Sequence, residues 1–125
     1  MFTTMESSAS SALLPTAPVT VGPVVLHVDH GCARVQGAPV WLTPREFAVL
    51  TFLAAHATLP VAKDEIHRAV WGEPVAGFKD RSVDVHVVRL RRTLAAACPD
   101  FTYIHTHHGI GYRFDPEPVA FGPSS

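Results

Sequence analysis

One stretch, RSVDVHVVRLRRTL at residues 81–94, limits the fold of this chain more than any other. Its apolar residues recur at the spacing of an α-helix, in which successive residues are separated by about 100° of rotation. On that helical wheel four of them fall within one narrow sector, which we interpret as a face that packs into a core. They are Val83, Val87, Leu90 and Leu94. The pattern predicts a helix over residues 81–95 that is covered on this side and exposed on the other.

The outward side of this predicted helix is basic, whereas the chain as a whole is not. Five bases and two acids lie between Lys79 and Arg92, a local net charge of +3, while the full chain has 10 lysines and arginines, 11 acidic residues and a formal net charge of −1. Bulk charge therefore does not indicate a nucleic-acid partner, and only the placement of the charge can. The outward residues are Arg81, Val85, Val88, Arg89 and Arg92, with Ser82 at the edge and His86 and Arg91 at the boundary.

Two interpretations of this basic face differ in what they make of its valines. An arginine-rich helix face is most often a solvated surface, and that interpretation leaves Val85 and Val88 unexplained. A helix also fits the major groove of DNA, where arginine donates paired hydrogen bonds to guanine and an apolar side chain contacts the thymine methyl group. The mixture of arginine and valine is typical of a helix that reads bases.

The flanking sequence predicts an α+β domain. Alternating residues and two glycine-containing turns, at 30–31 and 36–37, predict an antiparallel sheet. Thr43 begins a capping box that starts the first helix, whereas the second helix has Ala62 at a cap position that alanine cannot serve. The predicted strands are 24–29, 32–36 and 39–42, the first helix covers 44 to about 57, the second covers 63–71, and a hairpin of 102–106 and 112–115 has a glycine-rich tip.

This order of elements is that of a winged helix-turn-helix, in which the third helix enters the major groove and the hairpin reaches the neighbouring minor groove or backbone. The folded domain is predicted to span residues 21–115. Residues 1–20, rich in Ser, Ala, Thr and Pro, are interpreted as a disordered tail or linker, and residues 116–125 as a flexible C-terminal tail.

Four motifs, in this order and spacing, resemble the DNA-binding domain of OmpR/PhoB-type response regulators: LTPREFAVLTFLA, IHRAVWG, RSVDVHVVRLRRTL and IHTHHGIGYRF. The resemblance covers about residues 24–115. It implies a winged helix-turn-helix with an N-terminal antiparallel β-sheet, three helices and a C-terminal β-hairpin wing. It also implies a bacterial two-component transcription regulator that binds double-stranded DNA at direct repeats, as a head-to-tail dimer, and contacts RNA polymerase through the loop 72–80.

The resemblance carries over the DNA-contacting positions of the family residue by residue. Base-facing positions fall on Ser82, Val85 and Arg89, and Val88 lies beside them where a polar or basic residue is common. Positions that contact the DNA backbone fall on Trp71, Arg81, His86, Arg91, Thr106 and Tyr112, and Arg92 joins them from the helical wheel alone. The wing is represented by His107, His108, Gly109 and Arg113.

Two departures from the family pattern bear on function. His108 replaces the arginine that usually precedes the first glycine of the wing. Because histidine is mostly neutral at pH 7, we expect a weaker or pH-dependent wing contact. A chain of 125 residues has no room for the phosphoacceptor receiver domain of the family. We therefore interpret it as either a stand-alone regulator or the effector half of a longer one.

Two other functions compete with DNA reading. A metal-responsive regulator would use the histidines at 105, 107 and 108 in the wing, or the group His27, His30 and Cys32 in the sheet. A zinc site usually needs three or four such ligands in tetrahedral geometry. A winged helix can also serve as a protein-interaction module with little DNA binding, because a fold does not determine a function.

Other functional classes lack sequence support. The chain has no nucleophile motif, phosphate loop or paired carboxylates of an enzyme, and we expect no cofactor and no metal. No segment approaches the roughly 18 apolar residues of a membrane span, and the N-terminus lacks the pattern of a signal peptide. The protein is therefore expected to be soluble and cytoplasmic, in association with the nucleoid. Cys32 and Cys98 are expected to be reduced thiols.

Overall fold

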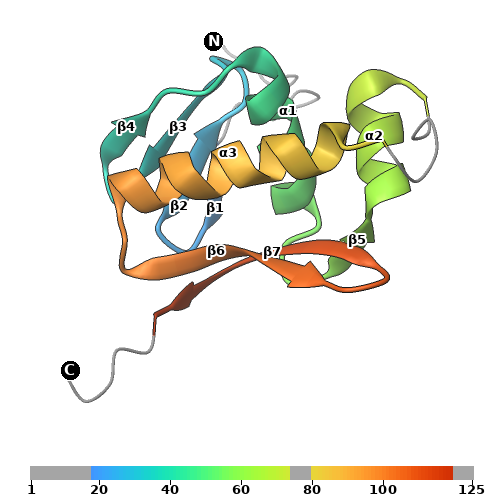
Figure 1. Cartoon of the computed structure of the whole chain (residues 1–125). Coiled ribbons are helices and arrows are strands. Elements are labelled where there is room, and N and C mark those ends of the chain that lie inside the picture. Colours follow the sequence, from blue (N-terminus) through green and yellow to red (C-terminus); the bar gives the residue numbers. More distant parts are fainter. Residues whose placement is uncertain (1–17, 74–79, 120–125) are drawn as a thin grey trace, which may run out of the picture.

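The computed structural model describes residues 18–73 and 80–119. Within these ranges the chain forms a four-stranded antiparallel sheet, three helices and a three-stranded antiparallel sheet (Figure 1). The first sheet contains, in this order, β1 (Val19–Val21), β2 (Val24–His27), β3 (Cys32–Val35) and β4 (Ala38–Val40). The helices are α1 (Pro44–Ala55), α2 (Lys63–Trp71) and α3 (Ser82–Ala97). The second sheet has the order β5-β7-β6, with β5 (Pro60–Ala62), β6 (Phe101–His107) and β7 (Gly111–Pro118). The predicted α+β class and winged helix-turn-helix architecture are confirmed.

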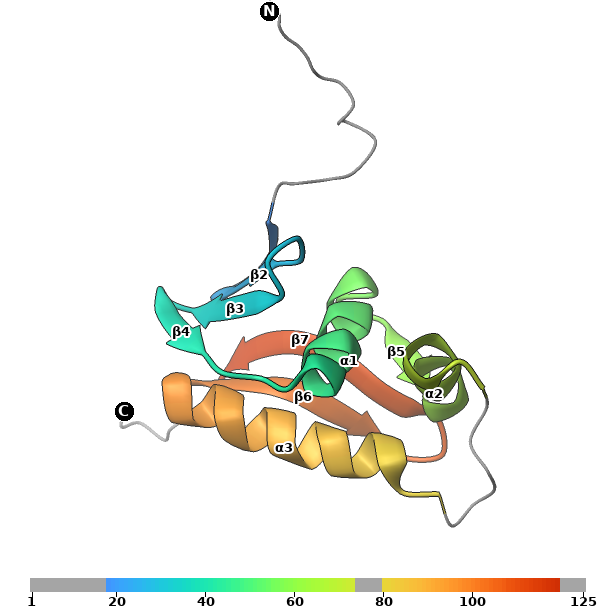
Figure 2. The ribbon, with the colours of Figure 1, turned by 90° about the horizontal axis from the view of Figure 1, so that it is seen from above.

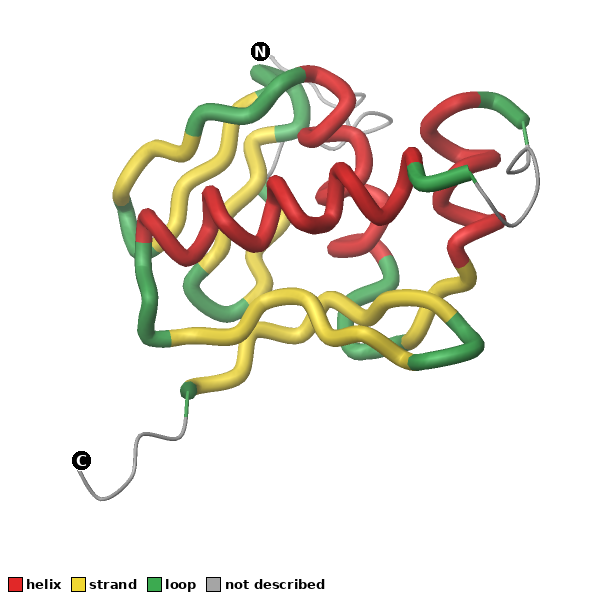
Figure 3. The backbone as a smooth tube through the Cα atoms, viewed as in Figure 1, coloured by secondary structure: helices red, strands yellow, loops and turns green. Residues whose placement is uncertain are grey.

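Helix α1 is at the centre of the domain. It contacts α2, α3 and β7, and in Figure 2 it lies between the first sheet and α2. Helix α3 runs along the β6–β7 hairpin, which we call the wing, and the tube in Figure 3 follows both elements to the same end of the molecule. The start of α3, α2 and the tip of the wing therefore lie close together.

The first sheet packs one face on the core. Along β2 and β3 buried and more exposed residues alternate, as expected for strands with one covered face. Val24 pairs with Val35 and Leu26 with Ala33, and all four are at most 1% exposed. These pairs seal one side of the core against the helices.

The N-termini of α1 and α2 are as the sequence predicts, with a side-chain cap on α1 and none on α2. The Glu46 N–H donates to Thr43 Oγ1 at 3.1 Å, and the Thr43 N–H donates to Glu46 Oε1 at 3.0 Å, which completes a capping box. Ala62 provides no side-chain cap for α2. Only the reverse half of a box is formed there, because the Ala62 N–H donates to Glu65 Oε1 at 3.2 Å.

The inward face of α3 is the one predicted from its period. Val83, Val87, Leu90 and Leu94 are each no more than 2% exposed and belong to the hydrophobic core cluster. Phe114 from β7 and Ile104 from β6 join the same cluster. Burial of this stripe fixes which side of α3 faces solvent.

Several predicted boundaries were wrong. Strand β7 continues to Pro118 and β1 occupies Val19–Val21, so the folded part exceeds 21–115 at both ends. The two short strands β1 and β5 were not predicted, since each has three residues and gains its order from pairing with a neighbour. Residues 1–17 and 120–125 of the predicted tails lie outside the described residues.

None of the helices in the described ranges is both long enough and apolar enough to cross a membrane. Cys32 is exposed and Cys98 is buried, and both are free thiols as predicted.

Candidate nucleic-acid interface

The outward face of α3 is open to solvent. Val85 is 41% and Val88 is 47% exposed, whereas the other two valines of α3, Val83 and Val87, are buried. Arg81, Arg89 and Arg92 are also exposed. Within the described part of the chain, neither Arg89 nor Arg92 has a hydrogen-bond or ion-pair partner, so both guanidinium groups can meet another molecule.

The first turn of α3 is held by a carboxylate that precedes it. Asp80 Oδ1 accepts a hydrogen bond from the Ser82 N–H at 2.9 Å and another from the Ser82 hydroxyl at 2.6 Å. One turn later, His86 Nδ1 donates to the Ser82 carbonyl at 2.8 Å. Ser82 is therefore engaged inside the protein, and its hydroxyl keeps only its acceptor capacity for a ligand.

Trp71 links α2 to α3. Its ring stacks on His67, with 4.7 Å between the ring centroids, and meets the His86 ring edge-on at 5.1 Å. The Arg45 guanidinium lies over the same indole at 4.8 Å. The predicted backbone-contacting residues Trp71 and His86 are thus brought together at the junction of the two helices.

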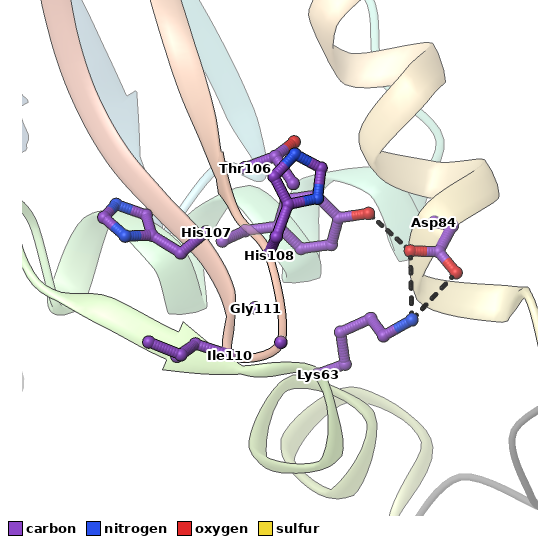
Figure 4. Close-up of a pocket in the computed structure, with 9 residues that line it drawn as sticks. Lys63, Asp84, Thr106, His107, His108, Ile110 and Gly111 are labelled. Carbon is purple, nitrogen blue, oxygen red and sulfur yellow. Dashed lines mark hydrogen bonds and ion pairs between the residues drawn. The ribbon is translucent and has the colours of Figure 1, made fainter.

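A cleft of about 390 Å³ separates the start of α3 from the tip of the wing. Figure 4 shows Lys63, Asp84 and His108 around it, while His107 points away on the far side of the hairpin. The residues that line the cleft are Lys63, Asp84, Thr106, His107, His108, Gly109, Ile110, Gly111 and Tyr112. Ile110, at the tip, is 57% exposed.

Asp84 is the ionic centre of this cleft. Its oxygens accept from Lys63 Nζ at 3.2 and 3.4 Å and from the Tyr112 hydroxyl, and Arg81 lies 3.6 Å away. Partial burial by itself raises the pKa of Asp84, but the hydrogen bonds from Tyr112 and Lys63 and the charges of Lys63 and Arg81 outweigh it and hold the pKa below its ordinary value. Asp84 is therefore ionised at neutral pH.

The hydrogen bond between Asp84 and Tyr112 shifts the pKa of Tyr112 upward, whereas it shifts that of Asp84 downward. Burial, followed by the hydrogen bond and the negative charge of Asp84, raises the pKa of Tyr112 to about 12. The residue is only 8% exposed, and its hydroxyl donates to Asp84. The predicted DNA-backbone contact at this residue would have to use the remaining lone pairs or release the carboxylate.

Arg91 is turned toward the wing. Its guanidinium donates to the Ile104 carbonyl at 3.0 and 3.1 Å and to Thr106 Oγ1 at 2.6 Å, and it lies 5.6 Å from the centroid of the Tyr112 ring. Three predicted backbone contacts, Arg91, Thr106 and Tyr112, are thus brought into one cluster between α3 and the wing.

Arg113 lies on the outer face of the wing. Tyr112 and Phe114 are buried in the hydrophobic core, and because side chains alternate along a strand, Arg113 points the other way. Its Nε donates to His107 Nε2 at 2.9 Å, and its guanidinium pairs with Asp115 and, at 3.5 Å, with Glu117. Arg113 therefore belongs to the wing but lies on the side that faces away from α3.

Two of the three wing histidines, His105 and His107, have protein partners. His105 Nε2 donates to the Asp115 carbonyl at 2.8 Å, and His107 accepts from Arg113. Among residues 18–73 and 80–119, no group of three or more potential ligands is arranged to hold a metal ion. His108 and Gly109 are exposed at the tip, where Gly109 adopts a φ of +81°.

Comparison with known proteins identifies the family. Residues 37–114 match the family model described as transcriptional regulatory protein, C terminal. The chain belongs to this OmpR/PhoB-type family.

Two relatives illustrate how much of a regulator the OmpR/PhoB-type domain represents. It is 36% identical over 108 residues to the transcriptional regulatory protein PrrA of Mycobacterium tuberculosis, covering 86% of this chain and 46% of PrrA. It is 32% identical over 98 residues to the phosphate regulon transcriptional regulatory protein PhoB of Pseudomonas aeruginosa, covering 78% of this chain and 42% of PhoB. The chain spans less than half the length of these relatives.

Solved structures share the architecture of this OmpR/PhoB-type domain. The DNA-binding domain of CpxR from E. coli aligns with a TM-score of 0.70 and 28% identity, covering 78% of this chain and 95% of that one. The RstA DNA-binding domain of Klebsiella pneumoniae, in complex with the RstA box, aligns with a TM-score of 0.71 and 29% identity, covering 80% and 98%.

Sequence reasoning missed the acidic and buried members of the site. Asp84 and Lys63 are 21 residues apart, and Asp84 and Tyr112 are 28 apart, so no local spacing signals their contact. The buried His67 was also missed: it bonds to the Glu73 carbonyl and lies 3.4 Å from Asp80 Oδ2. Most of the predicted RNA-polymerase loop 72–80, namely residues 74–79, lies outside the described residues.

Proposed function

We propose that this OmpR/PhoB-type domain is the sequence-specific DNA-binding module of a bacterial transcription regulator. Helix α3 would lie in the major groove, and the wing would contact the neighbouring backbone or minor groove. The main support is the outward face of α3, where the exposed Val85 and Val88 lie next to Arg89, whose guanidinium has no partner among the described residues. Exposed valine side chains make no favourable interaction with water, but they can contact the methyl groups of thymine. The likeness to the RstA domain, whose structure contains DNA, adds support.

We assign residues to roles by their position. Bases would be read by Ser82, Val85, Val88 and Arg89. The DNA backbone would be contacted by Trp71, Arg81, His86, Arg91, Arg92, Thr106 and Tyr112, and the wing tip would contribute His108 and Gly109. The His107 side chain lies on the far side of the hairpin, so it would not join them. Arg113 is placed on the outer face of the wing, so its part in this proposal is to hold His107 rather than to meet α3-bound DNA.

The wider assembly belongs to the same proposal. The family resemblance supports binding to direct repeats as a head-to-tail dimer and a contact with RNA polymerase through the loop 72–80. It also supports a cytoplasmic location in association with the nucleoid.

The test begins with selection of binding sites from genomic DNA by the purified chain, followed by titration of the best site over a range of salt concentrations. Enrichment of a direct-repeat motif is expected. The affinity should fall steeply with salt, with a logarithmic slope of about −0.9 for each phosphate neutralised. No enrichment at low salt would contradict the proposal and favour a protein partner for the basic helix.

Two arginine variants separate base reading from charge. Arg89→Ala should cost about 1–3 kcal/mol on the selected site and relax specificity, whereas Arg81→Ala should weaken binding to all sequences alike. The matched control is Arg34→Ala, since Arg34 is exposed on β3, away from α3 and the wing, and donates to the nearby Gly37 carbonyl. Equal losses of Arg89→Ala on selected and random DNA would contradict its assignment as a base reader.

A further inference from the structure

We propose that Asp84 is a positioning residue that fixes the wing against the recognition helix, and this inference rests on the proposed DNA-binding function. Asp84 points into the cleft that would receive the phosphate backbone, where a carboxylate repels DNA. We therefore look for the role of Asp84 in its contacts with other parts of the protein.

The contacts of Asp84 join three elements. It belongs to the first turn of α3, and it binds Lys63 at the start of α2 and Tyr112 on β7. The Asp84 side chain is only 18% exposed. Because the Tyr112 hydroxyl reaches across from the wing, this one carboxylate sets the distance between the wing strand β7 and the base-reading helix.

A second attachment lies on the same side of α3. Arg91 follows Asp84 by seven residues, which is close to two helical turns, so the two side chains leave the helix in nearly the same direction. Arg91 binds Ile104 and Thr106 of β6. The two wing strands are thus each bonded to α3 by one charged side chain, Asp84 to β7 and Arg91 to β6.

Two explanations of Asp84 predict opposite results for its removal. If Asp84 mattered only as a negative charge in the interface, its loss would tighten binding to every DNA. If it positions the wing, its loss would weaken binding to the selected site, since α3 and the wing would no longer be held at one spacing. The sign of the change in affinity distinguishes the two.

A pair of variants with identical charge change makes this test. Asp84→Ala and Asp84→Asn each remove one negative charge, but the asparagine oxygen can still accept from Tyr112. We expect Asp84→Ala to lose about tenfold in affinity for the selected site, a loss typical of one hydrogen bond to a charged group, and Asp84→Asn to recover most of it. Asp29→Asn is the charge-matched control, because Asp29 lies in the turn between β2 and β3 and its ion pair is with the neighbouring His30.

Equal or tighter binding of both Asp84 variants to the selected site would overturn the proposal. Loss of selectivity in Asp84→Ala with rescue in Asp84→Asn would support it. Circular dichroism of each variant establishes that a change in affinity does not come from unfolding.

A measurement without DNA keeps this proposal separate from the proposed function. Hydrogen exchange of the amides at residues 107–112 should be about tenfold faster in Asp84→Ala, with smaller change in Asp84→Asn and none in β2 and β3. Unchanged exchange in the wing would overturn the positioning role. Faster exchange in a protein that selects no DNA site would support that role and contradict the proposed function instead.

Discussion

Replacing Gly111 with alanine is expected to open the second sheet next to the tip of the wing. Gly111 begins β7, where it pairs with Ala62 of β5 on one side and with His107 of β6 on the other. A Cβ atom at this position would lie 1.9 Å from the Val61 carbonyl oxygen and 2.9 Å from the Ala62 Cα atom. Both are backbone atoms, so no side chain can rotate away to make room.

The size of the effect follows from these distances. Non-bonded carbon and oxygen need more than 3 Å, so β5 and β7 must separate by about 1 Å or more, which stretches their hydrogen bonds beyond the usual range. Each lost backbone hydrogen bond costs about 1 kcal/mol, and overpacking adds about 1–3 kcal/mol. With one hydrogen bond lost, we therefore expect Gly111→Ala to lower the free energy of unfolding by about 2–4 kcal/mol.

The matched control is Gly109→Ala in the same wing. A Cβ atom there meets nothing within 4 Å, and the substitution has only the cost of a φ of +81°, about 1–2 kcal/mol. Urea denaturation followed by circular dichroism gives both values, and each kcal/mol should lower Tm by about 4–8 °C. A loss for Gly111→Ala no greater than that for Gly109→Ala would refute the steric argument.

Two further predictions concern the helix starts and the tyrosine at the cleft. Thr43→Ala should lower the free energy of unfolding by about 1 kcal/mol because it removes the capping-box acceptor. Ala62→Ser should raise the free energy of unfolding by about the same amount because it supplies a cap that alanine lacks. Thermal unfolding measures both changes, and a change of the same sign in both variants would contradict the capping argument. Because the folded-state pKa of Tyr112 is raised to about 12, its contribution to stability is fully present below the unfolded value near 10 and is lost as the pH rises toward 12. Tyr112→Phe should therefore have a lower free energy of unfolding than the wild type at pH 8. The difference in free energy between the two proteins should narrow by up to roughly 3 kcal/mol between pH 10 and 12. Urea denaturation at each pH measures this difference, and a constant value across the range would refute the prediction.

Local patterns predicted a large part of the fold. The apolar period of residues 81–95 identified the buried and exposed sides of α3, and the capping box at Thr43 identified the start of α1. These signals lie within one or two helical turns, where the geometry of the backbone alone brings side chains together. The short strands β1 and β5 show no period and become ordered by pairing with β2 and β7. Strand β4 is equally short, and only the glycine-containing turn at 36–37 made it predictable.

In the candidate site, too, local features were predicted and contacts between distant segments were not. The outward residues of α3, among them Val85 and Arg89, were predicted from the sequence because one helix presents them all. The contacts of Asp84 with Tyr112 and of Arg91 with Thr106 were not, because each joins side chains 15 or 28 residues apart whose meeting depends on how the wing packs on α3. By itself the sequence determined which face of one helix can meet a partner, since helical period is a local property. Only the tertiary structure showed that Arg91 is bonded to the wing and that Asp84 joins Lys63 and Tyr112 across the cleft. Contacts between segments that are distant in the sequence have no local signature.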